Sequence, residues 1–175
     1  MDRVELRTLI REIPDFPKPG IVFKDITPLL LEPAALDRAV AELAAFARPL
    51  RVDLVVAAEA RGFILGAALA RELGAGFVPA RKPGRLPSDT VSVEYILEYG
   101  IDALEVHADA LGEGTRVLVH DDLLATGGTA RGVCDLVAGL GAEIAGCAFL
   151  IELSFLGGRK RLAPYPVHAV LEYAS

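Results

Sequence analysis

A chain of 175 residues with 53% hydrophobic and 24% charged residues is long enough for one domain with a full core, and its composition is globular. The net charge of −6 argues against non-specific binding to nucleic acid or to an acidic membrane. A phosphate-binding site in this chain therefore has to be a local cluster of basic residues.

The first predicted element is a short amphipathic helix, whose apolar residues are Val4, Leu6, Leu9 and Ile10. Residues 13–26 follow as a predicted irregular segment, because their three prolines and one glycine exclude a helix. This segment nevertheless keeps apolar side chains such as Phe16, Val22 and Phe23. It either covers the core or forms a hood that offers a flat apolar slot to a planar ring.

The next segments alternate between helix and strand. Residues 36–50 place apolar side chains on one helical face, residues 52–58 read as a buried strand, and residues 64–73 as a helix. This alternation predicts an α/β fold with an open, mostly parallel sheet flanked by helices and with ligands at the carboxyl ends of the strands. Arg61 follows the strand at such an end, either as a solvated turn residue or as a ligand contact.

A basic loop follows the short strand predicted at residues 76–80. Residues 81–90 contain Arg81, Lys82 and Arg85 together with proline and glycine, which predicts a mobile, solvated loop. The loop is either plain surface or a lid that closes over an anionic group and excludes water. Residues 91–99 are then predicted to form a strand.

The central stretch reads as strand, turn and helix. Residues 116–122 form an apolar strand that ends in two carboxylates, and residues 125–129, Ala-Thr-Gly-Gly-Thr, form a turn before a helix. Such a turn collects free N–H groups at a helix N-terminus, where the helix dipole favours an anion. Gly127 and Gly128 let the backbone approach that anion. The turn adds hydroxyl donors at Thr126 and Thr129.

The two carboxylates, Asp121 and Asp122, cannot both serve an anion directly. Beside a bound phosphate they could accept hydrogen bonds from sugar hydroxyls or act as outer ligands of a divalent cation. A sugar phosphate is a ligand that combines an anion for the turn with hydroxyl groups for the carboxylates. The stretch is neither a Walker A loop nor a dinucleotide-binding fingerprint, because it lacks both patterns.

The remaining chain adds strands at residues 143–153 and 167–171, with a turn at residues 154–159. Cys134 and Cys147 lie in apolar segments without metal-site spacing, so we expect buried thiols and a reducing, cytoplasmic environment. The N-terminal residues have no signal-peptide pattern, and the longest late apolar run is too short to span a bilayer.

The central stretch, residues 116–130, resembles the phosphoribosyl-pyrophosphate (PRPP) signature of the type I phosphoribosyltransferases. His120 departs from it, because the family usually carries an apolar residue there, and we expect a change in packing. The resemblance implies one domain over residues 1–175, with a hood at approximately 1–34 and a core at approximately 35–175.

Residues 13–28 and 95–107 further resemble the adenine phosphoribosyltransferases within that family. This resemblance implies that Val22, Phe23 and Lys24 surround the base, partly through backbone groups, with Leu156 as the opposite wall. It also implies that Glu98 is the acid or base group for the purine and that Tyr99 is a positioning residue for the substrate.

For the donor, the resemblance implies that Arg61, Arg81, Lys82 and Arg85 contact pyrophosphate. Asp121 and Asp122 would hold the ribose hydroxyls, and the 5′-phosphate would be anchored by Ala125, Thr126, Gly127, Gly128 and Thr129. The family often has a cis peptide in the loop after the first buried strand, which by match lies between Glu59 and Ala60.

The implied reaction converts adenine and PRPP to AMP and pyrophosphate, with Mg²⁺ held mainly by PRPP and at most through water by the two aspartates. The implied assembly is a homodimer. Two alternatives remain open, a phosphoribosyltransferase for another base and a non-catalytic PRPP sensor. The acidic chain, which shows no separate nucleic-acid-binding segment, disfavours the sensor.

Overall fold

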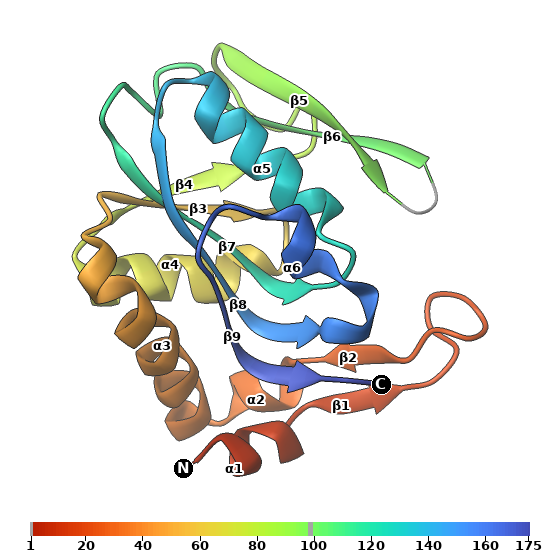
Figure 1. The fold of residues 1–175 in the computed structure, drawn as a ribbon. Coiled ribbons are helices and arrows are strands. Elements are labelled where there is room, and N and C mark those ends of the chain that lie inside the picture. Colours follow the sequence, from red (N-terminus) through yellow and green to blue (C-terminus); the bar gives the residue numbers. More distant parts are fainter. Residues whose placement is uncertain (1, 98–99) are drawn as a thin grey trace.

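The computed structural model describes residues 2–97 and 100–175. Its centre is a five-stranded sheet in the order β4-β3-β7-β8-β9, with parallel pairing between all neighbours (Figure 1). The strands are β3 (Leu54–Ala58), β4 (Gly76–Ala80), β7 (Arg116–Leu124), β8 (Glu143–Leu153) and β9 (Val167–Tyr173). The predicted open parallel sheet is confirmed, although β7 continues past the two aspartates to Leu124.

Helices cover both faces of this sheet. Helices α3 (Pro33–Ala47) and α4 (Gly62–Leu73) pack on one face, and α5 (Gly128–Gly139) packs on the other (Figure 1). Leu118 of β7 belongs to the core under α3 and α4, whereas Val117 and Val119 belong to the core under α5. This alternation is the ordinary pattern of a strand that is buried on both faces.

The helix predicted at residues 36–50 is shifted toward the N-terminus. It begins at Pro33, because proline suits the first helical position, where an amide would have no intrahelical partner. It ends at Ala47, and the residues Arg48–Leu50 form a 3₁₀ turn instead.

The hood is more regular than predicted. Helix α1 (Arg3–Thr8) precedes β1 (Arg11–Ile13), which pairs antiparallel with β2 (Phe23–Asp25), and α2 (Thr27–Leu31) follows. The prediction that residues 13–26 are irregular throughout is therefore wrong at both ends. The prolines lie in the loop between the strands, where they do not remove any pairing between β1 and β2.

The hood is attached to the last strand of the sheet. The ammonium group of Lys24 and the guanidinium carbon of Arg7 both lie 4.3 Å from the ring centroid of Tyr173. Lys24 is only 6% exposed and also forms an ion pair with Glu12. Arg7 donates a hydrogen bond to the carbonyl of Glu172. The beginning and the end of the chain are thus joined (Figure 1).

A separate hairpin lies on the α5 side of the sheet. Strand β5 (Thr90–Leu97) pairs antiparallel with β6 (Gly100–His107), and the hairpin packs against α5 (Figure 1). The predicted residues Glu98 and Tyr99 fall outside the described residues. The basic loop begins with Arg81, whose backbone pairs with Glu105 of β6.

The C-terminal connection runs from β8 through a 3₁₀ turn (Ser154–Leu156) and the short helix α6 (Gly158–Arg161) into β9. Cys134 and Cys147 are buried free thiols, as predicted. Across the described ranges 2–97 and 100–175, none of the helices has the length and apolarity needed to cross a membrane.

Candidate active site

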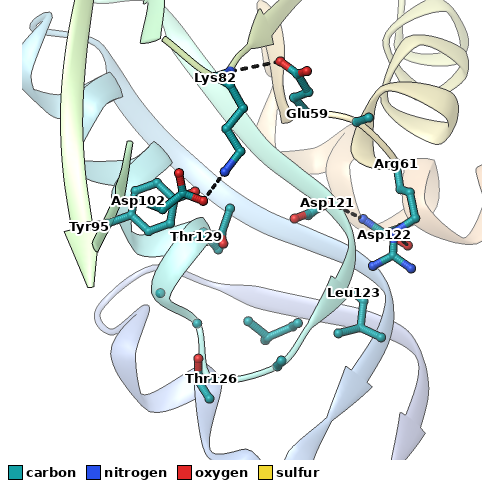
Figure 2. A pocket seen from close by; sticks show the side chains of 16 residues that line it. Glu59, Arg61, Lys82, Tyr95, Asp102, Asp121, Asp122, Leu123, Thr126 and Thr129 are labelled. Carbon is teal, nitrogen blue, oxygen red and sulfur yellow. Dashed lines mark hydrogen bonds and ion pairs between the residues drawn. The ribbon is translucent and has the colours of Figure 1, made fainter. Parts of the chain in front are cut away.

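A pocket of about 300 Å³ opens at the carboxyl ends of β3 and β7, beside the N-terminus of α5 (Figure 2). The predicted residues that line it are Arg61, Lys82, Asp121, Asp122 and all five residues of the turn 125–129. The lining residues to which the sequence analysis gave no role in binding or catalysis are Glu59, Ala60, Tyr95, Asp102, Leu123, Leu124 and Ala130. Segments far apart in the chain therefore meet in one cavity.

The turn at residues 125–129 forms the floor beside α5. Gly127 has a φ of 83°, a left-handed conformation that favours glycine, and α5 begins at Gly128. Among the described residues, no side chain caps α5, so its first N–H groups remain available to a ligand. Together with the helix dipole, these groups make the turn a site for an anion.

Asp121 and Asp122 leave β7 in opposite directions, because side chains alternate along a strand (Figure 2). Burial, and then the charge of Asp122, raise the pKa of Asp121 well above its usual value. Burial also raises the pKa of Asp122, although the charge of Arg61 acts in the other direction.

Arg61 is the cation closest to this acidic pair. Its Nε lies 3.2 Å from Oδ2 of Asp122, a carboxylate that is 2% exposed. Within the described part of the chain, the buried atoms Nη1 of Arg61 and Oδ2 of Asp122 have no hydrogen-bond partner. An unused donor and an unused acceptor at one corner of the pocket suit a polar ligand that carries both groups.

Glu59 fixes the start of the basic loop. Its Oε2 accepts a hydrogen bond of 2.9 Å from the backbone N–H of Lys82 and one of 3.1 Å from Nε of Arg81. The hydrogen bond from Lys82 lowers the pKa of Glu59 most strongly, so this carboxylate stays charged at neutral pH. The peptide between Glu59 and Ala60 is cis, as predicted.

Lys82 crosses the pocket to the hairpin, where it forms an ion pair with Asp102 (Figure 2). Tyr95 is the cross-strand partner of Asp102, and its hydroxyl faces Asp102 and Thr129. Burial, and then the charge of Asp102, raise the pKa of Tyr95 to about 12. A hairpin that pairs Leu97 with Gly100 would have placed Tyr95 opposite Asp102 at the sequence level.

Comparison with known proteins adds the family. The sequence model described as "Phosphoribosyl transferase domain" matches residues 30–167. An adenine phosphoribosyltransferase from Rubrobacter xylanophilus is 58% identical, over 96% of this chain and 91% of the relative. The chain belongs to the adenine phosphoribosyltransferase family.

Solved structures of adenine phosphoribosyltransferases share the fold. The enzyme from Thermoanaerobacter pseudethanolicus has a TM-score of 0.95 and 51% identity, over 98% of this chain and 99% of that one. The Saccharomyces cerevisiae enzyme, complexed with adenine and an imino-altritol bisphosphate, has a TM-score of 0.91 and 36% identity, over 97% and 98% of the two chains.

Four base-side residues that the structure describes, Val22, Phe23, Lys24 and Leu156, lie outside the lining of the pocket. Phe23 contacts a residue of the lining, because the guanidinium carbon of Arg61 lies 4.7 Å from its ring centroid. The side chain of Lys24 turns toward Glu12 and Tyr173, which leaves only its backbone for a base. Val22 and Leu156 are 46% and 38% exposed.

Two predicted pyrophosphate contacts also stand apart from the pocket lining. Arg81 is held by Glu59, and its Nη1 donates a hydrogen bond to the carbonyl of Arg85. Arg85 itself is exposed at the loop surface. Of the four predicted cations, the structure brings Arg61 and Lys82 into the pocket.

His120, the departure from the PRPP signature of the type I phosphoribosyltransferases, points away from the pocket. It is fully buried, its Nδ1 lies 2.9 Å from the carbonyl oxygen of Ala148, and a Cβ on Gly66 of α4 would lie 3.3 Å from its Cδ2. Burial lowers the pKa of His120 to about 4. The residue therefore packs as a neutral core side chain.

Proposed function

We propose that this chain transfers the phosphoribosyl group of PRPP to adenine and releases AMP and pyrophosphate. The observation that carries the proposal is the pocket itself. It combines an anion-binding turn at the N-terminus of α5, a carboxylate pair and two cations within about 300 Å³. A sugar that carries phosphates at both ends offers a partner to each of these groups.

The donor is proposed to lie along the carboxyl ends of β3 and β7. The 5′-phosphate binds the N–H groups and hydroxyls of the turn 125–129, and the ribose hydroxyls donate to Asp121 and Asp122. Arg61 and Lys82 contact the pyrophosphate, and Arg81 and Arg85 join them when the loop closes. Binding energy from the remote 5′-phosphate is then available to orient the anomeric carbon.

Mg²⁺ is proposed as the cofactor. Among residues 2–97 and 100–175, no three His, Cys, Asp or Glu side chains are arranged to hold a metal. The pocket fits an ion carried by the donor, because Oδ2 of Asp122, which has no hydrogen-bond partner among the described residues, can accept a hydrogen bond from a water bound to the ion. When bound, Mg²⁺ neutralises charge on the pyrophosphate.

The reaction proposed at the anomeric carbon has an oxocarbenium-like transition state with departing pyrophosphate. Arg61 and Lys82 stabilise the negative charge that develops on the leaving group. Closure of the loop at residues 81–90 excludes water, which would otherwise attack the same carbon. Glu98 is proposed to handle the purine proton, and Tyr99 is proposed to position the substrate. Positioned acid and base groups typically contribute about 10²- to 10⁴-fold.

Adenine is proposed to bind between the hood and the pocket. Phe23 gives the slot a flat wall, the backbone of residues 22–24 supplies polar contacts, and Leu156 closes the far side. The Saccharomyces cerevisiae relative was solved with adenine bound, which supports adenine as the base. A slot of this kind suits a purine without a six-position oxo group.

The organisation proposed for the protein is one domain over residues 1–175, with a hood at approximately 1–34. We propose a cytoplasmic homodimer that binds neither nucleic acid nor membranes. The net charge of −6 and the two free, buried thiols support these assignments.

The test is an endpoint assay with PRPP, Mg²⁺ and each purine base in turn, with the nucleotide product detected by chromatography. We expect AMP from adenine and no nucleotide from guanine, hypoxanthine or xanthine. A nucleotide formed from another base would keep the reaction and overturn the base assignment. Tight PRPP binding without any product would support a sensor instead.

A further inference from the structure

Asp102 neutralises a cation that the proposed function assigns to the donor. Its Oδ2 forms an ion pair with Nζ of Lys82, and the two side chains are 30% and 43% exposed. Both residues line the pocket, so the ion pair lies where a bound anion would meet the lysine. Glu59 does not neutralise the ammonium group of Lys82, because it accepts a hydrogen bond from the backbone N–H of Lys82 instead.

The hairpin holds Asp102 in this position. Its Oδ1 accepts a hydrogen bond of 2.9 Å from the N–H of Ala103, and Tyr95 faces it from the paired strand. Tyr95 is 7% exposed, and its ring packs so tightly on α5 that a Cβ on Gly132 would lie 2.8 Å from Cδ1. The carboxylate is thus presented to Lys82 from a supported strand pair.

Asp102 also remains charged at neutral pH. Burial acts to raise its pKa, but the hydrogen bonds from Lys82 and from Ala103 outweigh burial, so the pKa is lowered. When pyrophosphate reaches Lys82, one ammonium group faces two anions. Asp102 and pyrophosphate then compete for this ammonium group, so the ion pair with Asp102 weakens the contact of Lys82 with pyrophosphate.

We propose that Asp102 acts through Lys82 as an internal competitor that weakens pyrophosphate binding and speeds its release. This inference rests on the proposed function, because it needs Lys82 in the pyrophosphate site. A partly exposed ion pair of this kind changes affinity by about two- to fivefold.

The experiment measures the dissociation constants of Mg²⁺-pyrophosphate and of AMP by calorimetry, for the wild-type protein and for the Asp102→Asn variant. We expect pyrophosphate to bind about two- to fivefold more tightly to Asp102→Asn. AMP affinity should not change, because AMP has no pyrophosphate. A merely structural role of Asp102 would weaken both ligands. Asp102→Ser provides a second reading if Asp102→Asn does not fold.

The matched control is Glu94→Gln, which removes one exposed carboxylate from the neighbouring position on β5. It reports the effect of net charge alone, and we expect little change in either affinity. In a Lys82→Gln background, Asp102→Asn should change the affinity for pyrophosphate by no more than Glu94→Gln does in the wild-type protein.

Three results would overturn the inference: unchanged or weaker pyrophosphate binding to Asp102→Asn, an equal gain in Glu94→Gln, or an equal gain without Lys82. Each of these leaves the proposed function in place if the wild-type protein still forms AMP. Absence of both pyrophosphate binding and AMP formation in the wild-type protein would overturn the proposed function and, with it, the inference.

Discussion

Gly158 of α6 packs directly against the backbone of Gly127 in the anion-binding turn. A Cβ on Gly127 would lie 2.7 Å from the carbonyl oxygen of Gly158, and a Cβ on Gly158 would lie 2.2 Å from that of Ala125. Neither position has room for a side chain. The C-terminal connection therefore supports the turn from behind, a contact between segments about thirty residues apart that local sequence patterns do not reveal.

Gly158→Ala should displace the turn at residues 125–129 and weaken phosphate binding. The added methyl group meets backbone atoms that cannot rotate away, so we expect a loss of about 1–3 kcal/mol in the free energy of unfolding. AMP affinity, measured by calorimetry, should fall by about tenfold or more. The control Gly139→Ala, where a Cβ meets nothing within 4 Å, should fold and bind normally.

Gly132→Ala should disturb the hairpin through Tyr95. A Cβ at this position would lie 2.8–3.0 Å from the Tyr95 side chain, so the ring has to shift away from α5. We expect kcat to fall, because Tyr95 lies on the strand that leads to Glu98. The double variant Gly132→Ala/Tyr95→Leu should regain thermal stability, and no regain would mean that the clash is relieved elsewhere.

Asp122→Asn should separate stability from activity. Burial raises the pKa of Asp122, so the charged form destabilises the fold at neutral pH, and removing the charge should not lower Tm. The KM for PRPP should rise by about tenfold or more, because the ribose hydroxyls lose a charged acceptor. Asp135→Asn, which removes an exposed carboxylate paired with Arg131, is the control. Unchanged kinetics in a folded Asp122→Asn protein would remove its role as ribose acceptor.

His120→Val should reduce the loss of stability on acidification. The folded pKa of about 4 lies below the ordinary value of 6.5, so the unfolded chain binds more protons between these pH values. The contribution of neutral His120 to the free energy of unfolding is therefore intact above pH 6.5 and is lost as the pH falls toward 4. Denaturant unfolding measures the free energy of unfolding of both proteins. Between pH 6.5 and 5, the wild-type protein should lose about 2 kcal/mol more of this free energy than the variant does.

The comparison isolates His120, because His168, whose pKa burial also lowers, is present in both proteins. Equal pH dependence of the two proteins would show that His120 is protonated without loss of the fold. Circular dichroism at both pH values checks that the variant keeps its secondary structure.

The parallel sheet and the central turn could be predicted because they depend on local patterns. The apolar run before Asp121 and the two glycines after it fix a buried strand and a sharp turn in consecutive residues. The cis peptide at Glu59–Ala60 was also placed correctly, but only by family resemblance.

Other parts of the site depend on packing that the sequence does not display. To predict that Tyr95 pairs with Asp102, one has to know the register of the hairpin. To predict where the side chain of Lys24 points, one has to know which residues of β2 face each side of the strand pair. Lys24 has an aromatic ring and a carboxylate as partners at the sheet edge, which outweighs any preference of its charge for the pocket side.

The attachment of the hood to Tyr173 has a consequence for synthesis of the protein. Lys24 and Arg7 are made first, but the ring that they pack against, Tyr173, follows in the last strand of the sheet. A nascent chain can therefore form the sheet strands β3, β4 and β7 while its N-terminal residues still lack their anchor. The hood can settle on Tyr173 only when β9 has also left the ribosome.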